Sequence, residues 1–272
     1  MPAFDCTTAS IAAWNLAGFQ TIDDERVERQ IEGLAIIDAH VVTLVEVKPL
    51  SHMQRLVDGL AAKGCTYKSV ILPQASDLNI GVLYKEGVIA GTPEFIPNSD
   101  LGNPARRKAF AVDMKIGKFD FHLIVVHLKS GRGAAEQAER DEQCKVIGGY
   151  ITARTNDPDN QIRREDILLM GDFNMIPGED VSNFHHLGGD DIMNFVSSWD
   201  LQERFSHILP KGRANLLDGF AITRKRSTEY IKGSLRLFPM HWTMDMGRET
   251  YRNEVSDHLP FIASFRIDRS RD

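Results

Sequence analysis

A carboxylate and an amide follow an apolar, strand-like run in the second half of the chain. Ile167–Met170 leads into a glycine, after which Asp172 and Asn174 stand two residues apart. Side chains at i and i+2 of an extended chain point to the same side, so we expect both groups to face one site and Phe173 to point into the core. The pair suits metal-assisted or water-activating chemistry, with an Asx turn that caps the strand as the structural alternative.

Other apolar runs also end in, or contain, polar side chains that can do chemistry. Asp257 and His258 directly precede the run 259–265, and being adjacent they converge on one site only if the chain bends there. Glu46 follows another run, and a buried carboxylate is costly unless a cation or a hydrogen-bond partner compensates it. The remaining runs carry Asn15, His127 and Asp218.

Each of these groups has a structural explanation when taken alone, but the six runs together favour a site. Strand ends meet at one edge of a layered α/β fold, and ligand sites form there. A ring of acidic oxygens with amides and two histidines is typical of a hard-metal site for phosphate chemistry. We therefore expect Mg²⁺ as the cofactor, with Mn²⁺ able to replace it.

The order of these motifs resembles that of the endonuclease/exonuclease/phosphatase superfamily, to which deoxyribonuclease I belongs. The resemblance covers essentially the whole chain and implies a four-layer α/β sandwich, with two packed mixed β-sheets flanked by helices, in a single domain over 1–272. It also implies a divalent-metal phosphoesterase. The motifs that carry it are Asn15, Glu46, HLKSG at 127–131, GDFN at 171–174, Asp218 and SDH at 256–258.

The resemblance implies a metal-bound phosphate and an activated water. Glu46 matches the principal magnesium carboxylate, and Asp257 matches a second metal contact. Asn15, which borders the metal, and Asn174 match the amides that position the phosphate and the attacking water. Asp172 matches the carboxylate that activates this water.

The histidines also receive roles from the resemblance. His258 matches the histidine beside the scissile phosphate, Asp218 matches the carboxylate that orients it, and His127 matches a second catalytic histidine with Asp77 as a candidate orienting carboxylate. The chain departs from abasic-site endonucleases, which carry an aspartate where Ala17 stands. It also has Gly219 where many relatives carry histidine or tyrosine after the aspartate.

Three cations are candidates for binding the substrate phosphate. Arg107 opens the strand that leads toward His127, at a place where several members of the superfamily hold phosphate with arginine. Lys48 and Lys129 lie next to motif residues. Trp242 and Tyr251, ahead of the SDH motif, are predicted either to stack on a base or to pack in the core.

The elements that must position these residues alternate in type along the chain. Helices between apolar strands, with a hairpin in the middle, indicate sheets covered by helices on their outer faces. We expect helices at Asp23–Ile37, His52–Lys63, Gly133–Thr152 and Asp190–Trp199. We expect strands at Ser10–Asn15, Val41–Val47, Asn79–Tyr84, Phe110–Ile116, Phe119–His127, Asp166–Met170, Asn215–Thr223 and His258–Ile267.

The composition narrows the class of protein further. With 42% apolar and 26% charged residues among 272, the chain is typical of a folded globular protein, and no apolar run approaches the roughly 18 residues that span a bilayer. The N-terminus lacks the pattern of a secretory signal, so we expect a cytoplasmic protein. We also expect a monomer without stable membrane insertion. Three widely separated cysteines argue against a zinc site, and a net charge of -6 argues against wholesale coating of nucleic acid.

The sequence therefore predicts a Mg²⁺-dependent phosphodiesterase that hydrolyses phosphodiester bonds by attack of an activated water. A nuclease is favoured, acting on DNA rather than RNA. A phosphatase or a sphingomyelinase-like phospholipid phosphodiesterase is the alternative. A catalytically inactive binding scaffold is a remote third reading, since Glu46, Asp172 and His258 are all present.

Overall fold

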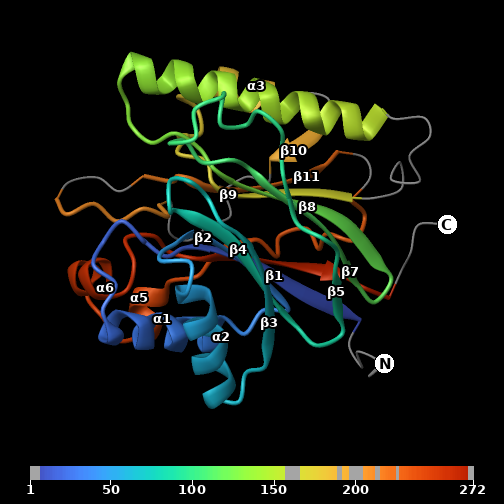
Figure 1. Ribbon diagram of the computed structural model, residues 1–272. Helices are drawn as coiled ribbons and strands as arrows, with labels where there is room; N and C mark the ends of the chain where they lie inside the picture. Colours follow the sequence, from blue (N-terminus) through green and yellow to red (C-terminus); the bar gives the residue numbers. More distant parts are fainter. Residues whose placement is uncertain are drawn as a thin grey trace.

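Two mixed β-sheets lie face to face in the computed structural model, and helices cover both outer faces (Figure 1). The structure describes residues 7–156, 166–188, 192–195, 205–211, 215–224 and 227–268. This layering is the four-layer α/β sandwich predicted from the sequence, and it places the strand ends of both sheets at a common edge.

The first sheet has the strand order β12-β13-β1-β2-β4-β3. Only its β1–β2 pair is parallel, with Asn15 opposite Val45, and the other pairs are antiparallel. The strands are β1 (Thr8–Asn15), β2 (Val41–Val47), β3 (Tyr67–Leu72), β4 (Asn79–Lys85), β12 (Arg236–Leu237) and β13 (Phe261–Arg266).

The second sheet has the order β10-β11-β9-β8-β7-β5, and the short β6 also pairs with β7. Again one pair is parallel: β8 runs beside β9, with His127 opposite Asp172. The strands are β5 (Val88–Ala90), β6 (Glu94–Phe95), β7 (Phe110–Ile116), β8 (Phe119–His127), β9 (Asp166–Asp172), β10 (Met193–Phe195) and β11 (Asp218–Thr223).

Each parallel pair needs a crossover, and a helix provides it in both sheets. Helix α1 joins β1 to β2, and α3 joins β8 to β9 on the opposite side of the sandwich (Figure 1). Helix α1 begins where the Asp23 carboxylate accepts a hydrogen bond from the backbone N–H of Arg26 at 2.8 Å. The helices are α1 (Asp24–Ile37), α2 (His52–Ala62), α3 (Ala134–Asn156), α4 (Val181–His186), α5 (Met240–Thr243) and α6 (Arg248–Glu254).

The central strands β8 and β9 of the second sheet are largely apolar on both faces because each face packs against a layer. On β9, Leu168 and Met170 join the core between the sheets, whereas Ile167 and Leu169 join the core beneath α3. Strands buried on both faces read as continuous apolar runs, and this pattern makes them visible in the sequence. These two buried strands end at the predicted site residues His127 and Asp172.

The helix predicted at Asp190–Trp199 is wrong in the part that the structure describes. Met193–Phe195 is instead the edge strand β10, which pairs antiparallel with β11. Its Phe195 ring packs edge-on against Phe173 and Phe184, so contacts distant in sequence override the local helical spacing. Residues 190–191 and 196–199 of this segment lie outside the described residues.

Two predicted strands begin later than expected. The last strand starts at Phe261 instead of His258, and the preceding prediction starts at Asp218 instead of Asn215. Asn215 and His258 form isolated bridges to the same residue, His207, rather than joining the sheets. These short bridges gather three loop residues at the edge where the strands end.

Candidate active site

The parallel strand pairs of the two sheets end on four polar side chains that meet across the sandwich. Asn15 and Glu46 come from β1 and β2, and His127 and Asp172 come from β8 and β9. The Asn15 amide donates to Glu46 Oε1 at 3.2 Å and to Asp172 Oδ2 at 3.1 Å. Its two hydrogen bonds therefore join one carboxylate from each sheet.

His127 makes a second link between the same carboxylates. Its Nε2 atom lies 3.3 Å from Glu46 Oε1 and 3.8 Å from Asp172 Oδ2. Burial, followed by the positive charges of Arg107 and His258, holds the pKa of His127 well below its ordinary value. The ring is therefore neutral at pH 7, and its Nδ1 atom has no hydrogen-bond partner among the described residues. Asp77, the candidate to orient it, instead pairs with Lys48 at 3.7 Å.

Glu46 is held by the turn that follows Asn15. The backbone N–H of Phe19 donates to Glu46 Oε2 at 3.3 Å. Gly18 lies so close to β2 that a Cβ atom there would stand 1.9 Å from the Glu46 carbonyl oxygen, so only glycine fits. Burial raises the pKa of Glu46, and a bound cation would offset that cost.

The GDFN motif forms an Asx turn and also contributes side chains to the site, so both alternatives given for its sequence hold. Asn174 has a positive φ of 50°, and its backbone N–H donates to Asp172 Oδ1 at 2.8 Å, which is an Asx turn. The turn leaves Asp172 Oδ2 facing Asn15, while the Asn174 amide donates to the Leu128 carbonyl at 3.2 Å. Phe173 points into the core and is 1% exposed, as predicted. The turn thus shapes the site.

The SDH motif bends as its sequence required. The Ser256 hydroxyl donates to the Asn15 carbonyl at 2.6 Å and accepts from the backbone N–H of His258 at 3.0 Å. The His258 carbonyl accepts from Trp14 Nε1 and from the Tyr251 hydroxyl, each at 2.9 Å. Tyr251 is therefore a buried support of the motif, and the packing alternative predicted for it is correct.

Helix α1 fixes the SDH motif against the first strand. The Gln30 amide donates to the carbonyls of Leu16 and Val255, at 2.9 Å in both cases. Arg26 donates to the Val255 carbonyl at 3.0 Å and to the Asn253 carbonyl. Both side chains are buried polar groups whose partners include backbone carbonyls after β1 and at the end of α6, so α1 holds these two segments in one position.

Asp218 and His258 form an oriented pair beside Asp172. His258 Nδ1 lies 2.7 Å from Asp218 Oδ2, and its Nε2 lies 3.9 Å from Asp172 Oδ2. Burial lowers the pKa of His258, but the charge and hydrogen bond of Asp218, with the charges of Asp172 and Asp257, outweigh it and raise the pKa to about 10. Since Asp218 stands directly opposite Asp172 in the β9–β11 register, burial and this second charge raise the pKa of Asp172 to about 7.

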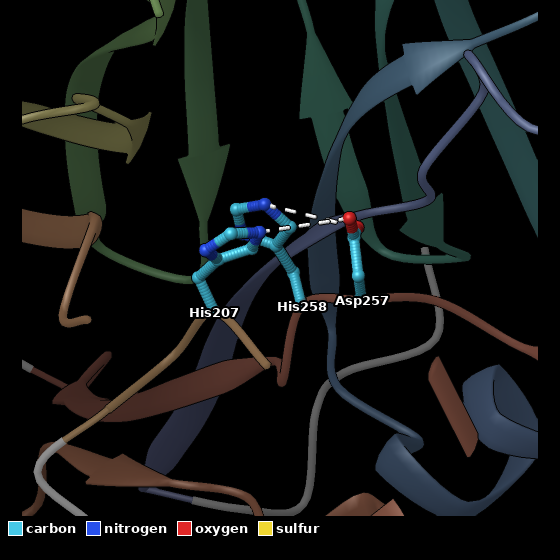
Figure 2. Close-up of side chains that lie close together, drawn as sticks. All are labelled: His207, Asp257 and His258. Carbon is cyan, nitrogen blue, oxygen red and sulfur yellow. Dashed lines mark ion pairs between the residues drawn. The ribbon is translucent and has the colours of Figure 1, made fainter. Parts of the chain in front are cut away.

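His207, which sequence reasoning missed, completes a second cluster at this edge (Figure 2). Its Nε2 lies 3.6 Å from Asp257 Oδ2, and His258 Nε2 lies 3.9 Å from Asp257 Oδ1. The two imidazole rings are 4.8 Å apart between centroids. Burial raises the pKa of Asp257, but the hydrogen bond from His207 and the charge of His258 keep it below its ordinary value.

One open pocket of about 450 Å³ is lined by Glu46, His127, Asp172, Asn174, His207, Asp257 and His258. Asn15 and Asp218 are not among its lining residues and contact those that are. Arg107 lies in its wall, with Nε donating to the His127 carbonyl at 3.1 Å and a terminal nitrogen donating to the Leu128 carbonyl at 2.6 Å. Lys48 and Lys129 are not among the lining residues, and their role in substrate binding stays a prediction. Trp242 is 59% exposed and lies outside the pocket.

A second arginine, Arg132, also lines the pocket, although it was not among the three cations predicted to bind phosphate. It pairs with Asp180 at 2.9 Å, and the fully buried Arg140 pairs with the same carboxylate at 3.2 Å. Arg140 also donates to the carbonyls of Lys129 and Gly131 at 2.8 and 2.9 Å, so it fixes the loop that carries Arg132. Two guanidinium groups share one carboxylate, which leaves positive charge at the rim.

The donor set fits a divalent cation with oxygen ligands. Glu46 and Asp172 stand in one group with His127, and Asp257 stands in another with His207 and His258, with possible ligand atoms within 4.8 Å of one another in each group. Because His258 is protonated, the carboxylate oxygens are the donors that a cation would use. Asp257 Oδ1 is buried and lacks a hydrogen-bond partner among the described residues. A bound cation would give this unpaired carboxylate oxygen a partner. It would also stabilise the ionised form of Glu46, whose pKa is raised by burial.

Solved structures of similar fold cover nearly the whole chain. D. rerio TDP2 complexed with single strand DNA product has a TM-score of 0.69 at 18% identity, covering 96% of this chain and 100% of that chain. The human Nocturnin catalytic domain with bound sulfate anion has a TM-score of 0.68 at 15% identity, covering 95% and 94%. ANGEL2, a 2',3'-cyclic phosphatase, in complex with adenosine-2',3'-vanadate, has a TM-score of 0.64 at 14% identity, covering 98% and 98%.

The chain has the deoxyribonuclease I-like fold. No family model and no curated protein matches its sequence. In this deoxyribonuclease I-like chain the departure at Gly219 has a structural reason, because a Cβ there would stand 2.5 Å from the Phe173 ring. No helix in the described part of the chain is long and apolar enough to cross a membrane.

Proposed function

We propose that the chain is a divalent-metal-dependent phosphodiesterase whose substrates are nucleic acids, with DNA favoured over RNA. The observation that carries the proposal is the meeting of Asn15, Glu46 and Asp172 from two sheets beside the Asp218–His258 pair. An acidic cluster, a protonated imidazole and an arginine in one open pocket provide for a metal, a water and a phosphate together.

The metal site proposed here is built on Glu46, with Asp257 as a further contact and Asn15 at its border. Mg²⁺ is the proposed ion because the ligands are hard oxygens, and Mn²⁺ should replace it. The bound ion supplies Lewis-acid polarisation of the phosphate. It also lowers the cost of keeping several carboxylates ionised in a buried site.

The protein's own groups divide the remaining chemistry. Asp172, with a pKa of about 7, accepts a proton from the attacking water at neutral pH, and Asn15 and Asn174 hold that water and the phosphate. His258 stays protonated and donates to the phosphate oxygens, which gain charge in the transition state. The water oxygen forms the new bond to phosphorus as the bond to the leaving oxygen breaks, and the leaving alkoxide takes its proton from solvent.

Nucleic acid is the substrate class that the comparisons support. The TDP2 structure holds a single strand DNA product, and its fold covers 96% of this chain. A panel assay with Mg²⁺ tests the proposal on duplex DNA, single-stranded DNA, RNA, abasic DNA and sphingomyelin. Cleavage of one or more nucleic acids, lost in EDTA, is the expected result, and hydrolysis of sphingomyelin alone would overturn it.

Phosphatase activity is the second candidate, and one comparison favours it. ANGEL2, which is described as a 2',3'-cyclic phosphatase, has the same fold with a TM-score of 0.64. Adding an oligonucleotide that ends in a 2',3'-cyclic phosphate to the panel separates the two activities. The inactive scaffold has no support in the site, because Glu46, Asp172 and His258 all line the pocket.

Asp218→Asn is expected to move the alkaline limb of the kcat/KM profile to lower pH. The folded protein keeps the His258 proton up to about pH 10 because the carboxylates of Asp218, Asp172 and Asp257 together outweigh burial, and Asp218 contributes both a charge and a hydrogen bond. Removing the Asp218 charge should therefore lower the pKa of His258. The protonated ring is the active form, so activity should be lost at a lower pH in the variant. Asp113→Asn, in the remote Asp113–His122 pair, is the matched control. An unmoved limb in Asp218→Asn would remove His258 from this role.

Arg107→Ala is expected to raise KM for every nucleic acid by about tenfold, as loss of a charged hydrogen bond to phosphate implies. The slope of log K against log salt should fall in magnitude by about 0.9 on duplex DNA. Arg106→Ala is the control, since the neighbouring Arg106 pairs with Glu139 at 2.8 Å and does not line the pocket. Equal effects of the two variants would show that Arg107 acts through net charge alone.

A further inference from the structure

Phe19 is an aromatic side chain in an unusual place. Among the described residues five large apolar side chains are exposed, and Phe19 is the member of that group that lines the pocket. It is 59% exposed, although single exposed apolar residues on an open surface are ordinary and need no explanation. An exposed ring inside a pocket of carboxylates, histidines and arginines does need one.

The backbone holds this ring beside the reacting centre. The N–H of Phe19 donates to Glu46 Oε2 at 3.3 Å, and the N–H of Gln20 donates to the Ala17 carbonyl at 3.0 Å. The turn is further fixed because Gly18 touches the end of β2. The backbone of Phe19 is thus hydrogen-bonded to Glu46, the proposed metal ligand. The exposed ring can be covered by a bound substrate.

The lining of the pocket combines two kinds of chemistry. Phe19 and Leu78 supply apolar surface, whereas Arg107 and Arg132 supply positive charge. A nucleotide calls for the same combination, since its phosphate is anionic and its base presents a flat apolar face. An acyl chain would require a longer apolar wall, and the other described lining residues are mostly polar or charged.

We propose that Phe19 is the stacking platform for a nucleobase next to the scissile phosphate. This inference rests on the proposed function and names the feature of nucleic acid that the site recognises. Stacking on a phenyl ring is tolerant of sequence, because every base has a π-face. The enzyme would therefore need a base at this position without selecting which base it is.

The test uses two single-stranded DNA oligonucleotides of equal length, one with bases and one with abasic tetrahydrofuran sites in their place. The wild-type enzyme should have the lower KM for the oligonucleotide with bases. Phe19→Ala should raise that KM by roughly tenfold and leave the KM for the abasic strand unchanged. Phe19→Trp should restore the preference. Ile89→Ala, which truncates a side chain 52% exposed outside the pocket, should change neither value.

A binding measurement gives a readout that does not depend on turnover. In the Asp172→Asn background, an oligonucleotide containing 2-aminopurine should lose fluorescence as its base stacks on Phe19, and Phe19→Ala should abolish that loss. Cleavage of both oligonucleotides with no effect of Phe19→Ala would overturn the platform and leave the proposed function standing. Cleavage of neither by the wild-type enzyme would overturn both.

Discussion

Replacing Asp172 by asparagine is expected to lower kcat by roughly 10²–10⁴, the range typical of general acid–base groups. The side chain is buried, and its pKa of about 7 suits a group that must accept a proton near neutral pH. Asparagine retains the shape and can still accept from the Asn174 N–H, but it cannot accept that proton. The variant also loses a buried charge opposite Asp218.

Thermal unfolding distinguishes this chemical role from a structural one. Because the lost charge was destabilising, the melting temperature of Asp172→Asn should lie within about 4 °C of the wild-type value or above it. Asp166→Asn is the matched control, since Asp166 is buried at the other end of β9 and accepts from the Ser227 hydroxyl at 2.7 Å. Asp166→Asn should keep wild-type kcat. A loss of activity that follows unfolding in Asp172→Asn would show that the residue is structural.

Glu46→Gln is expected to lower kcat/KM by about 10²–10³ and to abolish stabilisation of the protein by Mg²⁺. An ion that binds the native state at 100 times its Kd stabilises that state by about 2.7 kcal/mol. Wild-type protein should therefore melt at a higher temperature in Mg²⁺ than in EDTA, and Glu46→Gln should melt at the same temperature in both. Glu229→Gln, at a buried glutamate outside the pocket, should keep the wild-type response.

The raised pKa of Glu46 determines how this side chain changes the stability of the metal-free protein with pH. The pKa of Glu46 is raised in the folded protein, so the native state holds a proton at pH values where the unfolded chain has lost it. This carboxylate therefore contributes a loss of stability as pH rises through and above its ordinary value of 4.5. In EDTA at pH 7, Glu46→Gln should be at least as stable as wild type. Lower stability of the variant under these conditions would contradict a metal role for Glu46.

The fold and the centre of the site could be predicted because the same strands carry both. Strands buried on two faces read as continuous apolar runs, and the polar residue at the end of such a run is conspicuous. Asn15, Glu46, His127 and Asp172 all lie at such ends, and the structure brings them together. The adjacent residues Asp257 and His258 can face one site only if the chain bends there, and the hydrogen bond from the His258 N–H to the Ser256 hydroxyl holds this bend.

The parts that sequence reasoning missed lie on loops or short edge elements. His207 reaches the site through single bridges to Asn215 and His258, which leave no pattern in the chain. Arg132 is placed by Asp180, 48 residues away, and nothing in its neighbours indicates that pairing. Strand β10 is fixed by its partner β11 and by aromatic packing, so its three residues carry no signal of their own.

The hydrogen bonds of the Asn15 amide join parts of the chain that lie far apart in sequence. Asn15 and Asp172 are 157 residues apart, and Trp14 reaches 244 residues to the His258 carbonyl. A chain cut in the exposed turn at 102–105 would leave Asn15 and Glu46 on one fragment and every other predicted catalytic side chain on the second. Neither fragment alone contains a complete site, so enzymatic turnover would report the reassociation of the two fragments directly.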